Sequence, residues 1–313
     1  MIVTVTINPA IDHVISVDRL AFDDRSYINS SRESPGGRGI NASYVIHSFG
    51  GKTLAVATSG GRAGKRLRKY LERCGFPVTL VPIENEIRTN LTITDRQGLT
   101  VNLNEAGPRL SESEVAAFEA VLYQTLDRAS WLMMCGSIPP GVPPSFYASL
   151  ISAARRKKVR TLLHAAGDAL SAGIEARPTV VTPNQHEAER LLGRMLFTRT
   201  HFFEAAERIR RMGPESVVLS LGSRGAVGAF ADGLVDAVPP SVQAVSPIGS
   251  GDALAAAYTW AMTRKAPSRG GAADALRWGV AAGTASALLP GMQFATLAQT
   301  RRIYRQVETG SAD

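Results

Sequence analysis

The fold class is set by residues 131–163, which read WLMMCGSIPPGVPPSFYASLISAARRKKVRTLL. Two short apolar runs, 131–134 and 159–163, enclose a stretch with helical spacing at 146–156. A strand, a helix and a second strand in this order form a βαβ unit, whose two strands run parallel. We therefore expect a parallel sheet covered by helices.

The same alternation continues on both sides of this unit. Residues 2–7 alternate like a strand, and further apolar runs predict strands at 54–57, 78–81, 179–181 and 217–220. Helical spacing is found at 41–49, 62–73, 112–126, 186–192 and 203–212, where Asn41 and Ser111 are expected to be helix caps. An antiparallel pair joined by Asp232-Gly233 is expected at 225–230 and 234–238, and Ala-rich helices at about 252–263, 271–288 and 295–307. The pattern predicts an α/β protein with a mostly parallel sheet flanked by helices.

Two segments break this alternation. Residues 10–34 are polar with short β-like islands, and 88–104 are expected to form a hairpin that turns at 95–98. Neither segment fits a βαβ unit, so both are assigned to a small sheet that stands off the main one as a lid. Because no Pro- or Ser-rich linker divides the chain, we expect residues 1–313 to form a single domain.

Composition excludes several classes of protein. The chain has 44% hydrophobic and 20% charged residues, as an ordinary globular protein has. Its net charge of +8 is scattered, which suits phosphates as well as nucleic acid, and we expect no nucleic-acid partner. Cys74 and Cys135 are too few for a disulfide framework or a four-ligand zinc site. We see no signal peptide and no membrane span, and we expect a soluble cytoplasmic protein.

The strongest candidate site is Pro247-Ile248-Gly249-Ser250-Gly251-Asp252, which directly precedes a helical run. Glycines at a helix start let successive N–H groups point at an anion such as a phosphate. A carboxylate beside that anion, here Asp252, can take a proton from an attacking hydroxyl. Alternatively, Asp252 is only a helix cap after a Gly turn.

A second glycine-rich motif is Gly36-Gly37-Arg38-Gly39-Ile40-Asn41. It allows a ligand to approach the backbone closely, and Asn41 offers a donor and an acceptor to sugar hydroxyls. Alternatively, it is a tight loop with an Asn cap. The chain has neither a Walker A loop nor His-Glu-x-x-His, which argues against a P-loop phosphotransferase and a zinc hydrolase.

Taken in order, the motifs resemble those of the ribokinase-like carbohydrate kinases, the PfkB family. Besides the two glycine-rich motifs, the set comprises Asn8-Pro9-Ala10-Ile11-Asp12, Arg88-Thr89-Asn90, Asn104-Glu105-Ala106-Gly107-Pro108, Gly136-Ser137-Ile138-Pro139-Pro140-Gly141, Pro183-Asn184-Gln185-His186-Glu187 and Ser220-Leu221-Gly222-Ser223-Arg224-Gly225-Ala226. The branch that the chain resembles most is the 1-phosphofructokinase and tagatose-6-phosphate kinase group. The resemblance runs from about Thr4 to Met262, and the helical tail also fits.

The resemblance implies a ribokinase-like three-layer fold and ATP-dependent phosphorylation of a hydroxyl of a hexose phosphate, namely fructose 1-phosphate, fructose 6-phosphate or tagatose 6-phosphate. Asp252 would be the general base, and Gly249, Ser250 and Gly251 the anion hole. The acceptor would be bound by Asp12, Gly37, Arg38, Asn41, Arg88 and Ser137, with Arg88 on its phosphate. Asn184, Glu187, Ser220, Gly222 and Gly225 would serve the nucleotide. Mg²⁺ would arrive with ATP, with Glu187 acting on it indirectly through water, and a homodimer would form through the β lid.

The sequence also departs from the family pattern. It has Arg38 and Ser250 where the family branch usually has Lys and Ala, Thr182 where it has Lys, and His164 where it has Asp. Tyr27 stands where an Arg is often found, and Arg25 lies nearby. Two alternatives therefore stay open, a kinase of a free sugar or nucleoside and a non-catalytic sugar-phosphate sensor.

Overall fold

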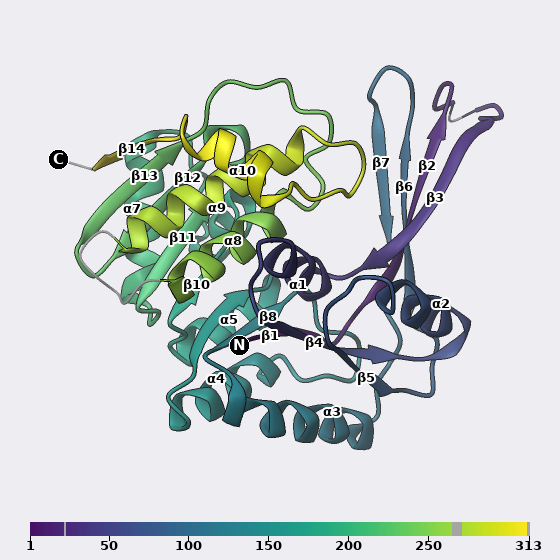
Figure 1. Cartoon of the computed structure of the whole chain (residues 1–313), viewed down its shortest axis with the longest axis horizontal. Helices are drawn as coiled ribbons and strands as arrows, with labels where there is room; N and C mark the ends of the chain where they lie inside the picture. The colour runs from purple at the N-terminus through teal and green to yellow at the C-terminus, as the bar shows by residue number, and fades with distance from the viewer. Residues whose placement is uncertain (22, 265–270, 312–313) are drawn as a thin grey trace.

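A central sheet organises the computed structural model, which describes residues 1–21, 23–264 and 271–311. Within these residues, ten strands hydrogen-bond in the order β14-β13-β12-β11-β10-β9-β8-β1-β4-β5, and the run from β11 to β5 is parallel (Figure 1). Their bounds are β1 (Ile2–Thr6), β4 (Thr53–Ser59), β5 (Val78–Pro82), β8 (Trp131–Cys135), β9 (Arg160–His164), β10 (Val180–Val181), β11 (Ser216–Ser220), β12 (Ala226–Phe230), β13 (Gly233–Val238) and β14 (Glu308–Ser311). The antiparallel pair β12–β13 and its turn confirm the prediction.

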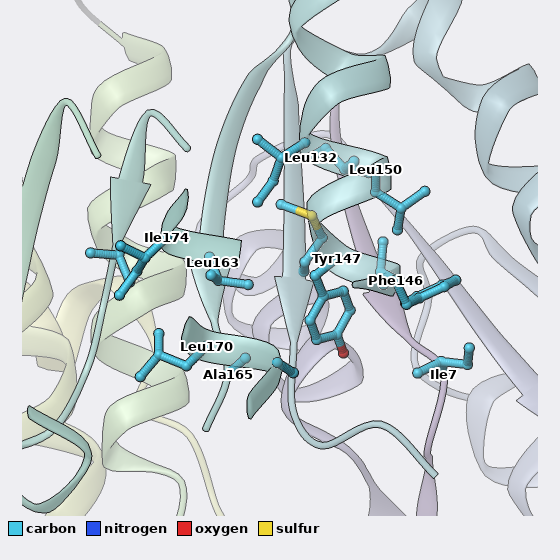
Figure 2. Packing of buried hydrophobic residues seen from close by; sticks show 14 of the residues in the cluster. Ile7, Leu132, Phe146, Tyr147, Leu150, Leu163, Ala165, Leu170 and Ile174 are labelled. Carbon is cyan, nitrogen blue, oxygen red and sulfur yellow. The ribbon is translucent and has the colours of Figure 1, made fainter. Parts of the chain in front are cut away.

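Helices cover both faces of this sheet. They are α1 (Arg38–Ser48), α2 (Gly61–Leu71), α3 (Glu112–Thr125), α4 (Phe146–Arg156), α5 (Gly167–Glu175), α6 (Gln185–Leu192), α7 (Arg199–Arg211), α8 (Ser250–Arg264), α9 (Gly271–Ala287) and α10 (Leu297–Tyr304). Successive strand residues point to opposite faces, so Leu132 and Met134 enter one core while Trp131 and Met133 enter the other. Helices α2 to α7 pack on the first core, where Figure 2 shows Tyr147 and Leu150 of α4 against the sheet. The three-layer α/β architecture is therefore confirmed.

A second sheet projects away from the helical layers as a long ribbon (Figure 1). We call it the lid sheet, and its strand order is β3-β2-β6-β7, with bounds β2 (Ala10–Val17), β3 (Ile28–Gly36), β6 (Arg88–Thr94) and β7 (Thr100–Asn104). Both segments expected to form a lid lie in it, although residue 22 of the first lies outside the described residues. Strands β2 and β6 pair in parallel, with Asp12 opposite Asn90, so two distant segments meet at the base of this sheet.

The cap predicted at Asn41 is wrong, whereas Ser111 does cap α3. Helix α1 begins at Arg38 with Gly37 as its N-cap, so Asn41 lies inside the helix. The reason is packing, because a Cβ at Gly39 would lie 2.4 Å from Thr6 Oγ1 and 2.7 Å from the Val5 carbonyl oxygen. Gly39 therefore serves close helix–strand contact, and it belongs to the helix and not to the preceding turn.

None of the helices in the described ranges is long and apolar enough to cross a membrane.

Candidate active site

The predicted site residues gather along one edge of the main sheet. Strands β1, β8, β9, β10 and β11 are parallel, so the segments that follow them emerge at the same edge. Asn8, Ser137, Thr182 and Asn184 follow these strands, and His164 and Ser220 end two of them. Ligands of open α/β sheets bind at this carboxyl edge.

Asp252 occupies the centre of this edge. It lies in the first turn of α8 and is buried. Its carboxylate Oδ2 accepts a hydrogen bond from Asn41 Nδ2 at 2.8 Å, and its Oδ1 lies 3.1 Å from His164 Nε2. Because each oxygen has a partner on a different element, the orientation of the carboxylate is fixed. The simple helix-cap alternative does not account for these two contacts.

The turn before Asp252 has the features of an anion site. Gly249 has a φ of +79°, a backbone conformation that other residues rarely adopt, and it leads directly into α8. The N–H groups in the first turn of a helix lack acceptors within the helix and can bind an anion. Ser250 Oγ is buried and has no hydrogen-bond partner among the described residues. An unpartnered buried hydroxyl at a helix start fits a phosphate oxygen.

A cavity of about 920 Å³ opens beside this turn. Its lining brings together Ser250, Gly251 and four residues predicted for the nucleotide, which are Asn184, Ser220, Gly222 and Gly225. Apolar side chains of Val227, Leu254 and Val280 form another part of the wall. A volume in the range of small-molecule sites, with apolar walls and a helix N-terminus at one end, fits a nucleoside phosphate.

The base of the lid sheet contributes a second carboxylate to this site, that of Asp12. Its Oδ1 accepts a hydrogen bond from Asn90 Nδ2 at 2.8 Å. A Cβ at Gly36 would lie 2.2 Å from Asp12 Oδ2, so only glycine leaves room for this carboxylate. Burial raises the pKa of Asp12 above its ordinary value; Asn90 and Arg88 oppose this effect, and the negative charge of Asp252 adds to it. The negative charges of Asp12 and Asp252 are thus close enough to act on each other.

Arg88 and Ser137 are joined through Asn8. Arg88 donates from its two terminal nitrogens to the carbonyl oxygens of Glu105, at 3.0 Å, and Asn8, at 3.1 Å. Asn8 Nδ2 in turn donates to Ser137 Oγ at 3.1 Å. A guanidinium has five N–H donors, and because Nε is buried, one hydrogen on each terminal nitrogen remains for a ligand. Burial lowers the pKa of Arg88, and the nearby charge of Asp12 opposes this effect.

Arg38 of α1 and Glu187 of α6 form an ion pair in this site. The guanidinium nitrogens of Arg38 lie 3.4 Å from Glu187 Oε1. Burial alone would lower the pKa of Arg38, but the negative charges of Asp252 and Glu187 outweigh it and raise this pKa. Arg38 therefore stays a cation next to the proposed base.

Glu187 lies in the first turn of α6. Glu187 is buried, and its Oε2 accepts a hydrogen bond from the Asn184 N–H at 2.9 Å. Asn184 Oδ1 accepts in return from the Glu187 N–H at 2.8 Å, so the two residues form a capping box at the start of α6. Packing of α6 against the sheet removes the carboxylate from solvent, which its sequence position does not reveal.

Across the part of the chain that the structure describes, no group of three or more His, Cys, Asp or Glu side chains could hold a metal ion. The arrangement instead provides cations and hydrogen-bond donors around two carboxylates, beside a cavity with an anion site.

Sequence reasoning gave no role to Asn8, Asn90, His164 or Thr182, although all four lie in this site. Asn90 has a signal in the sequence, because Arg88 and Asn90 are two apart on a predicted strand and so share a face. The positions of Asn8, His164 and Thr182 in the site depend on the order and register of the strands, and the sequence motifs do not give that information.

Replacing Asp12 by Asn should stabilise the fold at high pH. The raised pKa means that the folded state binds a proton more tightly than the unfolded chain, so the ionised form costs stability as pH rises through the folded-state pKa. The neutral amide of Asp12→Asn removes that cost, and its oxygen can still accept from Asn90. We expect the Tm of Asp12→Asn to exceed that of the wild type at pH 8 and to approach it near pH 4. A Tm difference that does not depend on pH would contradict this account of Asp12.

Comparisons with known proteins agree with the fold. Residues 3–299 match the family model described as pfkB family carbohydrate kinase. The ATP-dependent 6-phosphofructokinase isozyme 2 of Escherichia coli is 31% identical over 306 residues, which cover 97% of each protein. The 1-phosphofructokinase of Vibrio cholerae is 29% identical over 259 residues, which cover 83% of this chain and 82% of that enzyme.

Solved structures extend the likeness to three dimensions. A structure of phosphofructokinase-2 from E. coli in complex with substrates and products has a TM-score of 0.89 and 31% identity, covering 97% of this chain and 98% of that one. A ribokinase of Arabidopsis thaliana, complexed with ribose and ATP, shares the fold with a TM-score of 0.76 at 18% identity, again covering 97% and 98% of the two chains.

The fold is therefore ribokinase-like, and the enzyme class is that of the sugar kinases, which transfer phosphate to a hydroxyl group. The chain belongs to the pfkB family of carbohydrate kinases. The resemblance inferred from the ordered motifs is confirmed.

Proposed function

We propose that this protein transfers the γ-phosphate of ATP to a hydroxyl of a hexose phosphate, with Asp252 as the general base. The observation that carries the proposal is the position of Asp252. It lies in the first turn of α8, whose start lines the 920 Å³ cavity, and its negative charge acts on Asp12, which lies with Arg88 at the base of the lid sheet. The names of the two relatives point to different phosphofructoses, so fructose 1-phosphate and fructose 6-phosphate are both candidates. The resemblance of the motifs adds tagatose 6-phosphate as a third.

In the proposed reaction, the acceptor hydroxyl gives its proton to the Asp252 carboxylate. The hydroxyl oxygen forms a bond to the γ-phosphorus while the bond from that phosphorus to the β,γ-bridging oxygen breaks, and ADP leaves. The N–H groups of the Gly249–Gly251 turn stabilise the negative charge on the transferred group. Asp12, Gly37 and Asn41 hold the sugar hydroxyls in line, and the proton on Asp252 passes to solvent as the product leaves.

Arg88 and Ser137 are proposed to bind the phosphate of the acceptor. A guanidinium matches phosphate oxygens with paired, charge-assisted hydrogen bonds. Two of its donors already bind the carbonyl oxygens of Asn8 and Glu105, which fixes the plane of the group and leaves one hydrogen on each terminal nitrogen for the ligand. Ser137 lies beside it through Asn8.

Mg²⁺ is proposed to enter with ATP, held mainly by phosphate oxygens and water. Mg²⁺ gives up its water reluctantly and is commonly bound through substrate phosphates and one or two carboxylates. Glu187 is the carboxylate proposed to act on it through water. When bound, the ion neutralises charge on the phosphates.

Glu187→Gln tests this role. We expect kcat to fall and the magnesium dependence to shift to higher concentration, because the variant loses the negative charge. The Tm should fall modestly, since Gln can complete the capping box but no longer forms an ion pair with Arg38. Glu114→Gln is the matched control, because Glu114 completes the capping box of α3 far along the chain. A magnesium titration that is the same in Glu187→Gln and wild type would make Glu187 purely structural.

The proposed function is tested by measuring ADP release with hexose phosphates, free hexoses and nucleosides. We expect turnover with at least one of the three named hexose phosphates and far less with any unphosphorylated acceptor. Preference for a free sugar or nucleoside would support a kinase of that class instead. Binding of a sugar phosphate without ADP release would support the non-catalytic sensor.

We further propose that the chain works as one domain and as a homodimer formed through the lid sheet. Support comes from large apolar side chains exposed on this sheet and on the segments just before β3 and β7, namely Tyr27, Ile28, Leu99 and Leu103. Light scattering should therefore give twice the mass of one chain.

A cytoplasmic location is also proposed, because the only cysteines, Cys74 and Cys135, are both free thiols, as expected in a reducing compartment. Fractionation of cells would test this location.

A further inference from the structure

We propose that His164 holds the carboxylate of the general base, Asp252, in position. In this proposal, Thr182 determines which imidazole nitrogen of His164 carries the hydrogen. The inference rests on the proposed function, because it concerns the carboxylate of Asp252. It joins residues that end or follow two adjacent parallel strands, β9 and β10, to the first turn of α8.

The contacts form a chain of three side chains. His164 Nε2 lies 3.1 Å from Asp252 Oδ1, and His164 Nδ1 lies 2.9 Å from Thr182 Oγ1. All three side chains are buried. The ring also packs under the start of α8, since a Cβ at Gly251 would lie 3.8 Å from His164 Cε1. The imidazole is therefore held at both nitrogens and against the helix.

The hydrogen positions follow from the partners. A carboxylate oxygen only accepts, so Nε2 must donate to Asp252, and in a neutral ring Nδ1 must then accept. The Thr182 hydroxyl can donate to Nδ1. The Leu163 carbonyl, its other acceptor at 3.4 Å, already accepts the Thr182 N–H at 3.0 Å. Thr182 thereby favours the tautomer that places a hydrogen on Nε2.

Without this hydroxyl, nothing donates to Nδ1, and the preference for a hydrogen on Nε2 becomes weaker. The backbone carbonyl oxygen of Thr182 lies 3.1 Å from Nδ1 and attracts a hydrogen there. A hydrogen on Nδ1 leaves an unprotonated Nε2 facing the carboxylate of Asp252, and two acceptors then repel each other. Loss of the Thr182 hydroxyl should thus disturb Asp252 through the ring, although Thr182 is not a partner of Asp252.

None of the other polar or charged groups described near His164 takes over its hydrogen bond to Asp252 Oδ1. Arg38 acts on Asp252 by its charge, and no hydrogen bond joins the two among the described contacts. Cys135 pairs with His164 across β8 and β9, but burial raises the pKa of its thiol, so it stays neutral. Asn41 holds Oδ2, which leaves Oδ1 to His164. Both donors are needed to stop the carboxylate from rotating away from the acceptor hydroxyl.

Four variants separate this role from a structural one. Thr182→Val removes the hydroxyl at nearly constant shape, and His164→Leu removes the donor. Each should lower kcat by about 10- to 100-fold, as expected for losing one hydrogen bond to a charged group, while the KM values for ATP and acceptor change by less than about threefold. Thr182→Ser and His164→Gln keep a hydroxyl and an N–H donor, and should recover kcat to within roughly threefold of wild type.

Thr259→Val is the matched control. Thr259 is a buried threonine of α8 whose hydroxyl bonds the Ala255 carbonyl, away from the site. It should keep the wild-type kcat even if its Tm falls. Equal kcat values in Thr182→Val and wild type would overturn the proposal.

A second measurement does not depend on turnover. ¹⁵N NMR of histidine-labelled protein distinguishes the two imidazole tautomers, and His164→Gln identifies the His164 signals by their loss. We expect the hydrogen on Nε2 in the wild type and a larger fraction of it on Nδ1 in Thr182→Val. Equal tautomer populations in the two proteins would overturn the proposal. Absence of kinase activity alone would instead count against the proposed function, because the tautomer experiment would still stand.

Discussion

Asp252→Asn should lower kcat by at least the roughly 10²- to 10⁴-fold that removal of a general base typically costs. The substitution keeps the shape of the side chain and removes its ability to take the hydroxyl proton. The buried network can adapt, because Asn41 can turn its amide and present Oδ1 to the new N–H₂ group. ATP should therefore still bind, which a nucleotide titration measures separately from turnover.

Asp274→Asn is the control for this variant. Asp274 is also an acidic residue in the first turn of a helix, α9, where it contacts the Tyr304 hydroxyl outside the site. Its kcat should stay at the wild-type value. If Asp252→Asn also turned over at a near wild-type rate, Asp252 would not be the base.

Arg88→Ala should raise the KM for the sugar phosphate by about 30-fold or more, which corresponds to losing at least about 2 kcal/mol of binding free energy. The KM for ATP should change far less, because Arg88 lies at the base of the lid sheet and does not line the nucleotide cavity. Arg88→Lys should recover only part of the affinity, since an ammonium keeps the charge and loses the paired geometry.

Arg96→Ala controls for the loss of a cation from the lid sheet region. Arg96 lies in the turn between β6 and β7, where it is largely exposed and pairs with Asp18. It should leave both KM values unchanged. The idea that Arg88 binds a phosphate would fail if the wild-type enzyme used fructose and fructose 1-phosphate equally well.

The architecture could be predicted to a large extent, because periodicity determines it locally. The strands of the parallel sheet are apolar runs because both of their faces are buried, and the lid hairpin has a clear turn at its tip. Two elements carry no such signal. Helix α5 is short and contains Gly167 and Gly173, and β14 is a fully exposed strand of polar residues at the sheet edge.

The candidate site could be predicted residue by residue but not as a network. Ordered motifs indicate Asp252, Arg88 and the glycine turns, because each precedes or ends an element. The contact of His164 with Thr182 needs the pairing of β9 with β10, and that of Asp12 with Asn90 needs the register of β2 and β6. Two separate departures from the family pattern, His164 and Thr182, thus turn out to be neighbours joined by a hydrogen bond.

The central claim is phosphoryl transfer from ATP to a sugar phosphate by Asp252. The most direct test is ³¹P NMR of the products after incubation with MgATP and each of the three hexose phosphates. The account predicts that the wild-type protein forms ADP and a new phosphate ester on at least one of these sugars, and that Asp252→Asn forms neither. Sugar-phosphate binding with no new ester in the wild type, or equal ester formation by Asp252→Asn, would contradict it.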